Sequence, residues 1–194
     1  VLIIVMSVMN GFRSELISKI VGFNAHVTVK PYENPIDDKK LKNINLKSIS
    51  KEIIFSNSGE AIIIKNKYTK GIVLRGYRKN DFSKLDLVNN KHFIGDASNL
   101  TKNNISIGKE LSFNLNLKIG DKLTIMSPSG IETIIGNLPK QESFIINSIF
   151  DSGLADFDQN VAFININSLE SLFDINKKDR NLEIYLNDPV NIET

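Results

Sequence analysis

Three aspartates that lie close together near the C-terminal end are the first candidates for chemistry. Asp151, Asp156 and Asp158 fall within one short segment. Neighbouring carboxylates can act as general acid and base in hydrolysis, or can bind Ca²⁺. The segment lacks the D-x-D-x-D-G order and the later bidentate glutamate of an EF-hand loop. A polar connection between strands is the simpler interpretation, and hydrolysis at this cluster is kept as an alternative.

The other residues that could act in catalysis or bind a metal or phosphate do not occur in the motifs that such sites need. His26 and His92 are the only histidines, so no two have the close helical spacing of a zinc site. Gly108 and Lys109 are not followed by the Ser or Thr of a phosphate-binding loop. The serines in 127–129 do not lie in a G-x-S-x-G motif. We therefore expect no catalytic, cofactor-binding or metal-binding residue, and we expect that the chain is not an enzyme.

Composition narrows the classes of partner. A chain of 194 residues with 41% hydrophobic content can bury a substantial core, in one domain or in two small lobes. The 24 basic and 22 acidic residues give a net charge of +2, too balanced for a surface that neutralises many phosphates. Nucleic acid is therefore not an expected partner. The absence of cysteine excludes disulfides and thiolate metal sites, and it fits an oxidising or a reducing compartment.

The chain opens with the apolar run VLIIVMSVM. This run is about half of the roughly 20 residues that a membrane-spanning helix needs, and no basic region of a signal peptide precedes it. It is either a buried helix of a soluble protein or the last turns of a transmembrane helix. The second interpretation is favoured because an apolar helical stripe continues beside a polar face. The stripe consists of Val5, Met9, Phe12, Leu16 and Ile20.

Alternating apolar and polar residues predict several short strands. After Gly22, which can end the first helix, strands are expected at 25–29, 60–66, 69–75, 122–126, 144–150, 161–166 and 182–186. The second and third of these form a hairpin across Lys67 and Tyr68. Since strands and helices mix without a regular repeat, we expect the α+β class.

Two helices are expected between these strands. The first covers 107–117 and points Leu111, Leu115 and Phe113 inward. The second follows Asn167, because Glu170 lies at the capping-box spacing. The charged stretch 37–51 is either a short amphipathic helix or an exposed connection.

Residues 127–140, called the hook below, are predicted to form a protruding hairpin. Pro128 and Pro139 bound the segment, it contains two glycines, and strand candidates flank it. Its middle carries Ile131, Ile134 and Ile135, and large apolar side chains near the tip of an exposed loop suggest a partner surface. The alternative, in which these isoleucines fold back onto the core, stays open.

Several segments in order resemble the periplasmic part of the LolC/LolE-type membrane subunits of lipoprotein-releasing ABC transporters. They are VMSVMNGFRSEL with GFNAHVTV, then GIVLRGY, SIGKELSFNLNLKIGDKLTIMSP, and LPKQESF through IFDSGLADFDQNVAFI. The resemblance covers nearly the whole chain. The helix with its LKIGD turn is also similar to the wider group of MacB-like permeases, whereas the NGF, GFNAHVTV and FDSG segments are more specific.

This resemblance implies a MacB-like periplasmic core of the α+β class, with mixed sheets and short helices in two lobes. Residues 1–22 would be the outward extension of the first transmembrane helix, and 23–194 the periplasmic domain. One lobe would combine 23–80 with 150–194, and the other would span 81–149. The protein would lie in the bacterial inner membrane, with this part on the periplasmic side.

The implied function is release of lipoproteins from the inner membrane and docking of a LolA-like periplasmic lipoprotein chaperone. A separate LolD-like cytoplasmic ATPase subunit would hydrolyse ATP, and a second permease subunit and the lipoprotein substrate would be further partners. No cofactor is implied. One alternative is a MacB-like efflux permease that contacts an adaptor protein. A more distant alternative is a membrane-anchored periplasmic hydrolase.

The resemblance also assigns residues to the docking surface. Family members that recruit the chaperone carry a hook here, which assigns Pro128, Thr133, Ile134, Ile135, Gly136 and Pro139 to the contact. At the base of the hook, a polar and often basic patch corresponds to Thr124, Lys140, Gln141 and Glu142. Only Lys140 is positive and Glu142 is negative, so a patch of the usual sign is not expected. Solvated surface is an equal alternative for these four residues.

Overall fold

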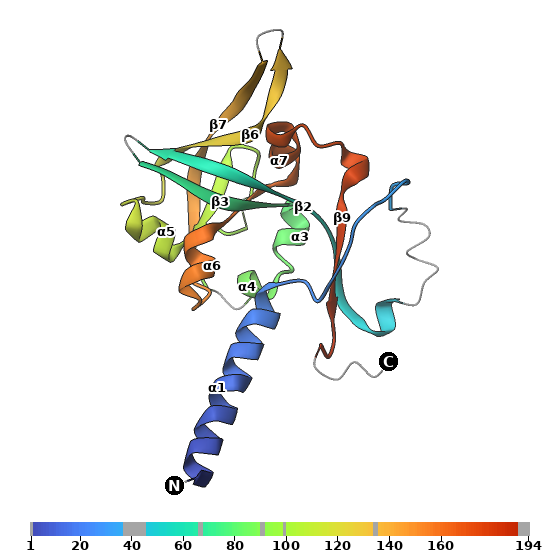
Figure 1. Ribbon diagram of the computed structural model, residues 1–194, viewed down its shortest axis with the longest axis vertical. Coiled ribbons are helices and arrows are strands. Elements are labelled where there is room, and N and C mark those ends of the chain that lie inside the picture. The colour runs from blue at the N-terminus through green and yellow to red at the C-terminus, as the bar shows by residue number, and fades with distance from the viewer. Residues whose placement is uncertain are drawn as a thin grey trace.

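The computed structural model combines a sheet of mixed strand directions with short helices, which confirms the α+β class (Figure 1). The structure describes residues 2–36, 46–65, 68–89, 92–98, 100–133 and 136–189. Helix α1 (Leu2–Phe23) extends away from the domain and leads into it at one end. Across the described ranges, no helix has both the length and the apolar character that crossing a membrane requires.

Six strands pair in a closed ring. In spatial order they are β2 (Ser50–Lys65), β3 (Tyr68–Tyr77), β8 (Val161–Asn165), β5 (Asn104–Gly108), β7 (Gly136–Phe150) and β6 (Lys122–Thr133). The β3–β8 and β5–β7 pairs are parallel, and the other four are antiparallel. Strand β6 closes the ring because it pairs with β7 and, through Thr124, Ile125 and Met126, with β2.

Three more strands extend this ring. Strand β9 (Asn181–Leu186) pairs with the first part of β2, and β1 (Val27–Val29) pairs with β9. Strand β4 (Phe93–Gly95) pairs with the end of β7. The short helices are α3 (Lys79–Phe82), α4 (Asp86–Asn89), α5 (Lys109–Asn114), α6 (Ala155–Asn160) and α7 (Ile166–Phe173), with 3-10 turns η1 (Leu46–Ser48) and η2 (Lys177–Asp179).

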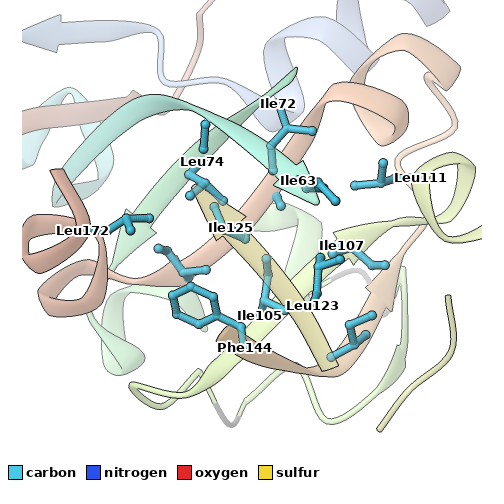
Figure 2. Close-up of a cluster of buried hydrophobic side chains, with 14 of the residues drawn as sticks. Ile63, Ile72, Leu74, Ile105, Ile107, Leu111, Leu123, Ile125, Phe144 and Leu172 are labelled. Atoms are coloured by element: carbon cyan, nitrogen blue, oxygen red, sulfur yellow. The ribbon is translucent and has the colours of Figure 1, made fainter. Parts of the chain in front are cut away.

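The main hydrophobic core fills the inside of the ring. Alternate residues of the strands point inward, so Ile63, Ile125 and Phe144 are fully buried although they come from β2, β6 and β7 (Figure 2). Leu111 of α5 and Leu172 of α7 pack against the same cluster. Burial of each such side chain stabilises the fold by about 1.5–3 kcal/mol, so the ring depends on this shared core.

A second, aromatic cluster lies beside the ring. Its central contacts join Phe163 of β8 to Phe150 of β7 and Phe82 of α3, with ring centroids 5.0 and 5.3 Å apart. Tyr77 of β3 and Phe157 of α6 complete it at 6.0 and 6.4 Å from Phe163. Tilted rings at such distances add favourable quadrupole contacts to their area burial. The cluster holds α3 and α6 against the strands.

The hairpin expected near 67–68 is confirmed as β2 and β3, but β2 begins at Ser50. Of the stretch 37–51, residues 37–45 lie outside the described residues, and its end is the 3-10 turn η1 and the start of β2. The division of 23–194 into two lobes stays a prediction.

The helix expected over 107–117 is wrong at both ends. Residues up to Gly108 belong to β5, because Ile107 completes the core of the ring, and the helix spans only Lys109–Asn114. Phe113 was expected to face inward, yet its side chain is 82% exposed. The core there is filled by Leu111, with Leu115 partly buried against it.

The cap of the last helix is also shifted. Asn165, the last residue of β8, caps α7 because its side chain accepts a hydrogen bond from the Asn167 backbone N–H. Glu170, expected to complete a capping box, is instead buried and bound by Arg180 at 2.6 Å. Glu170 therefore serves a tertiary ion pair and not a helix cap.

Gly108 tests the packing of β5 against α6. A Cβ atom there would lie 2.0 Å from the backbone oxygen of Asp158, whereas a Cβ at Gly71 would meet nothing within 4 Å. We expect Gly108→Ala to lower the free energy of unfolding by about 3 kcal/mol, because backbone atoms must move apart. Gly71→Ala should change it by less than about 1 kcal/mol. Urea denaturation of both variants measures this, and equal effects would contradict the close approach.

Candidate partner-docking site

The hook is built from the ends of β6 and β7. The strands pair from Lys122↔Ile145 to Ser127↔Lys140, and again from Ile131↔Leu138 to Thr133↔Gly136. Between these stretches, the three residues after Ser127 lie opposite Pro139 alone. A proline has no backbone N–H to donate to a ladder, so the pairing is interrupted where the prolines lie.

The outermost described pair of the hook is Thr133↔Gly136. Gly136 has a φ of 114°, a backbone conformation that favours glycine. The predicted anchors Ile134 and Ile135 lie outside the described residues, so their role stays a prediction.

The hook is buried at Ser127 and exposed farther out. Pro128, Gly136 and Pro139 are exposed, and the side chain of Leu138 is 52% exposed. Beyond Ser127, the described pairings of the hook are between β6 and β7 only, and Figure 1 shows this end projecting from the domain. Leu138 was not singled out in the sequence, although it is an apolar residue beside the bounding proline.

The four residues expected at the base of the hook are divided between two faces. Thr124 pairs with Ser143, and their hydroxyl oxygens are 3.2 Å apart. Gln141 lies opposite Met126 on the same face, and its Nε2 is 3.7 Å from the Met126 sulfur. Since side chains alternate along a strand, the neighbouring residues 140 and 142 point to the opposite face.

Lys140 and Glu142 lie on the face that α7 covers. The Lys140 ammonium donates to the backbone oxygen of Ser171 near the C-terminal end of α7. Glu142 lies opposite the buried Ile125, and its Oε2 is buried without a hydrogen-bond partner. The sequence-predicted base residues therefore do not form one continuous patch, and Lys140 is engaged in the fold.

An apolar groove continues from the hook over β2 and β3. It has a volume of about 470 Å³, and its lining includes Pro128 of the hook, Ile62 of β2, and Gly71 and Val73 of β3. Val73 is 36% exposed, so the outer face of these strands is partly apolar. This groove was not predicted from the sequence. The alternation of apolar and polar residues was used only to identify the side chains that face the core.

The three candidate catalytic aspartates have three different surroundings. The Asp151 carboxylate pairs with the Lys109 ammonium at 2.7 Å, and this hydrogen bond lowers the pKa of Asp151. Asp156 is exposed on the first turn of α6. Asp158 is only 2% exposed and accepts hydrogen bonds from the backbone N–H of Ser152 at 3.0 and 3.1 Å and from its hydroxyl at 2.5 Å.

These contacts give Asp151 and Asp158 structural roles. Burial raises the pKa of Asp158, and its bonds to Ser152 fix the loop between β7 and α6. His26 is also bound within the fold, since its Nδ1 accepts a hydrogen bond from the backbone N–H of Leu186 at 2.7 Å. Among the described residues, no group of three or more His, Asp or Glu side chains is arranged to hold a metal ion.

The role of Asp158 can be measured. In Asp158→Asn, the amide NH2 takes the place of one carboxyl oxygen, so it can no longer accept there and faces the Ser152 backbone N–H, which lies 3.0 and 3.1 Å from the two oxygens of Asp158. We expect a loss of about 1–3 kcal/mol of unfolding free energy. Because the folded-state pKa is raised above the usual 3.8, the wild type loses stability as pH rises from 3.8 to that pKa. The stability deficit of the variant should therefore be largest at and below pH 3.8 and shrink toward neutral pH in denaturant titrations. A deficit that grows with pH would contradict a raised pKa.

Comparison with known proteins finds curated relatives that share one name, LolC. No family model matches the chain. It is 26% identical over 204 residues to the lipoprotein-releasing system transmembrane protein LolC of Neisseria meningitidis serogroup B, covering 98% of this chain and 47% of that protein. It is 24% identical over 177 residues to LolC of Xylella fastidiosa strain Temecula1, covering 89% and 42%. The chain thus spans less than half the length of these relatives.

Two solved structures match most of this chain at low sequence identity. The extracellular domain of the noncanonic ABC-type transporter YknZ from Gram-positive bacteria matches 84% of each chain, with a TM-score of 0.47 and 13% identity. The periplasmic region of MacB from Actinobacillus actinomycetemcomitans covers 83% of this chain and 69% of its own, with a TM-score of 0.49 and 11% identity. The curated relatives confirm the resemblance indicated by the motifs: over most of its length, this chain is similar to LolC proteins.

Proposed function

We propose that this chain is the periplasmic docking domain of a LolC/LolE-type permease subunit in a lipoprotein-releasing ABC transporter. The observation that carries the proposal is the exposed, proline-bounded hook on a closed ring, in a chain similar to LolC. Residues 1–22 would extend the first transmembrane helix outward, and 23–194 would lie on the periplasmic side of the bacterial inner membrane.

In this proposal, the domain binds partners and does not turn over a substrate. ATP hydrolysis takes place on a separate LolD-like subunit, and a second permease subunit completes the transporter. The three aspartates support this division of labour, because each has a different local environment. The lipoprotein is handed to a LolA-like periplasmic chaperone that docks on the hook.

The hook suits docking because its two strands are fixed at the base. Thr124, Ile125 and Met126 pair on both edges, with β2 and with β7, so the projecting end is held on a rigid support. A few apolar anchors usually carry most of the affinity of such a contact. Ile134 and Ile135 at the tip are the proposed anchors, and Leu138 adds exposed apolar area beside them.

Binding of the LolA-like chaperone to the domain tests this function. Isothermal calorimetry should give micromolar binding for the wild type and at least about 30-fold weaker binding for Ile135→Asp and Leu138→Asp, because an unpaired carboxylate enters an apolar contact at a cost of about 2 kcal/mol or more. Phe113→Asp is the matched control, since Phe113 is 82% exposed on α5 and lies outside the hook. It should bind as the wild type does.

Thermal unfolding of each variant separates docking from folding. The hook variants should keep the wild-type melting temperature. A large drop for Ile135→Asp would place that side chain in the core and contradict its role as an anchor. If the folded wild type binds no chaperone, the docking proposal fails, and binding of an efflux adaptor protein should be measured instead.

A further inference from the structure

A small cleft on the side of the domain is lined by four cationic residues. It has a volume of about 190 Å³ and lies where η2 meets the strands. Its lining consists of Pro35, Ile36, Phe55, Arg78, Lys177, Lys178 and Arg180. No carboxylate is among these lining residues. We call this feature the basic cleft.

The two arginines of the basic cleft are held in place by the fold. Arg180 makes a bidentate contact with the buried Glu170 carboxylate, at 2.6 Å from Nε and 2.9 Å from Nη2. The Arg78 guanidinium lies 5.2 Å from the centre of the Phe55 ring, and its Nε is 3.7 Å from Asp81. Arg180 is thus largely neutralised, whereas Arg78 pairs, among the described residues, with Asp81 at 3.7 Å.

The two lysines have no such partner. Lys177 and Lys178 are exposed side chains on η2, a turn that is fixed because the Asn176 side chain accepts from the Lys178 backbone N–H at 3.2 Å. Neither ammonium forms an ion pair with another described residue. Asp179 follows them on the same turn but is not part of the lining. Two adjacent ammoniums beside Arg78 create a local positive potential that an anion would relieve.

Helix α7 connects the basic cleft to the base of the hook. Arg180 at the cleft binds Glu170, and Lys140 at the hook base binds the next residue, Ser171. In Figure 1, α7 lies between the β6–β7 hairpin and β9, and η2 forms the turn that joins α7 to β9. A protein seated on the hook can therefore reach the basic cleft across one short helix.

We infer that the basic cleft binds a carboxylate side chain from an acidic segment of a partner protein. The cleft is small enough to hold one side chain, and Pro35, Ile36 and Phe55 supply apolar surface for the methylenes of a glutamate. Its cations attract any anion, and this apolar lining favours a carboxylate on a side chain over a free inorganic anion. The inference goes beyond the proposed chaperone docking and does not depend on it.

A labelled hexaglutamate peptide tests the basic cleft directly. Fluorescence anisotropy at low salt should show binding to the wild type and roughly five- to tenfold weaker binding to Lys177→Gln/Lys178→Gln, since two exposed charge contacts are lost. The matched control is Lys118→Gln/Lys122→Gln, which removes the same charge from exposed lysines near α5 and the start of β6. It should bind within about twofold of the wild type, and salt should weaken all binding by screening.

Other outcomes overturn the inference. Equal losses in the two double variants would show attraction by net charge alone. Displacement of the peptide by inorganic phosphate at equal concentration would indicate a small-anion site, and tighter binding to phosphatidylglycerol vesicles than to the peptide would indicate a lipid surface. Leu138→Asp should still bind hexaglutamate as the wild type does, so a failure of the hook and a failure of the basic cleft are distinguishable.

Discussion

The architecture depends on one short ladder, the pairing of β6 with β2 over Thr124, Ile125 and Met126. Without it, the six strands would form an open sheet with two unpaired edges, and edges of that kind recruit other strands. With it, the inward side chains of β2, β6 and β7 meet in one fully buried core. The same ladder also ends at Met126, so the rest of β6 has only β7 as a partner and must leave the ring. The extent of the β2–β6 ladder thus explains both the closure of the ring and the projection of the hook from it.

Helix α7 links this ring to its surroundings through charged groups. Glu170 is 5% exposed, and it is bound by Arg180 and by the Asn57 side chain of β2 at 3.2 Å. Loss of one partner from a buried pair leaves an uncompensated charge, which lowers the free energy of unfolding by about 3–5 kcal/mol. The next residue, Ser171, accepts from Lys140 of the hook base. The orientation of the hook base, the buried ion pair and the basic cleft are therefore fixed by consecutive residues of one short helix.

Strands with clear alternation could be predicted from the sequence, and β3, β8 and β9 lie close to where they were expected. Short elements could not, because tertiary contacts decide them: Ile107 fits a helical pattern, yet it lies in β5 to fill the ring. The spacing of Asn167 and Glu170 matched a cap, but Glu170 is held by Arg180. The hook prolines could be identified from the sequence because they bound one continuous segment. The basic cleft could not, since Arg78 and Lys177 are brought together only by the fold.

The hook and the basic cleft would contribute to partner binding through different interactions. Apolar anchors at a hook supply affinity, because they lose contact with water when they dock, and they give little discrimination among apolar partners. Charges at the rim of an interface mainly steer the encounter and fix its orientation. The exposed Lys177 and Lys178 are of the second kind, and Leu138 is of the first. Thr124, Gln141 and Lys140 offer no single charged patch beside the hook. A partner that docks on the hook and also carries an acidic segment would therefore be oriented by the basic cleft across α7.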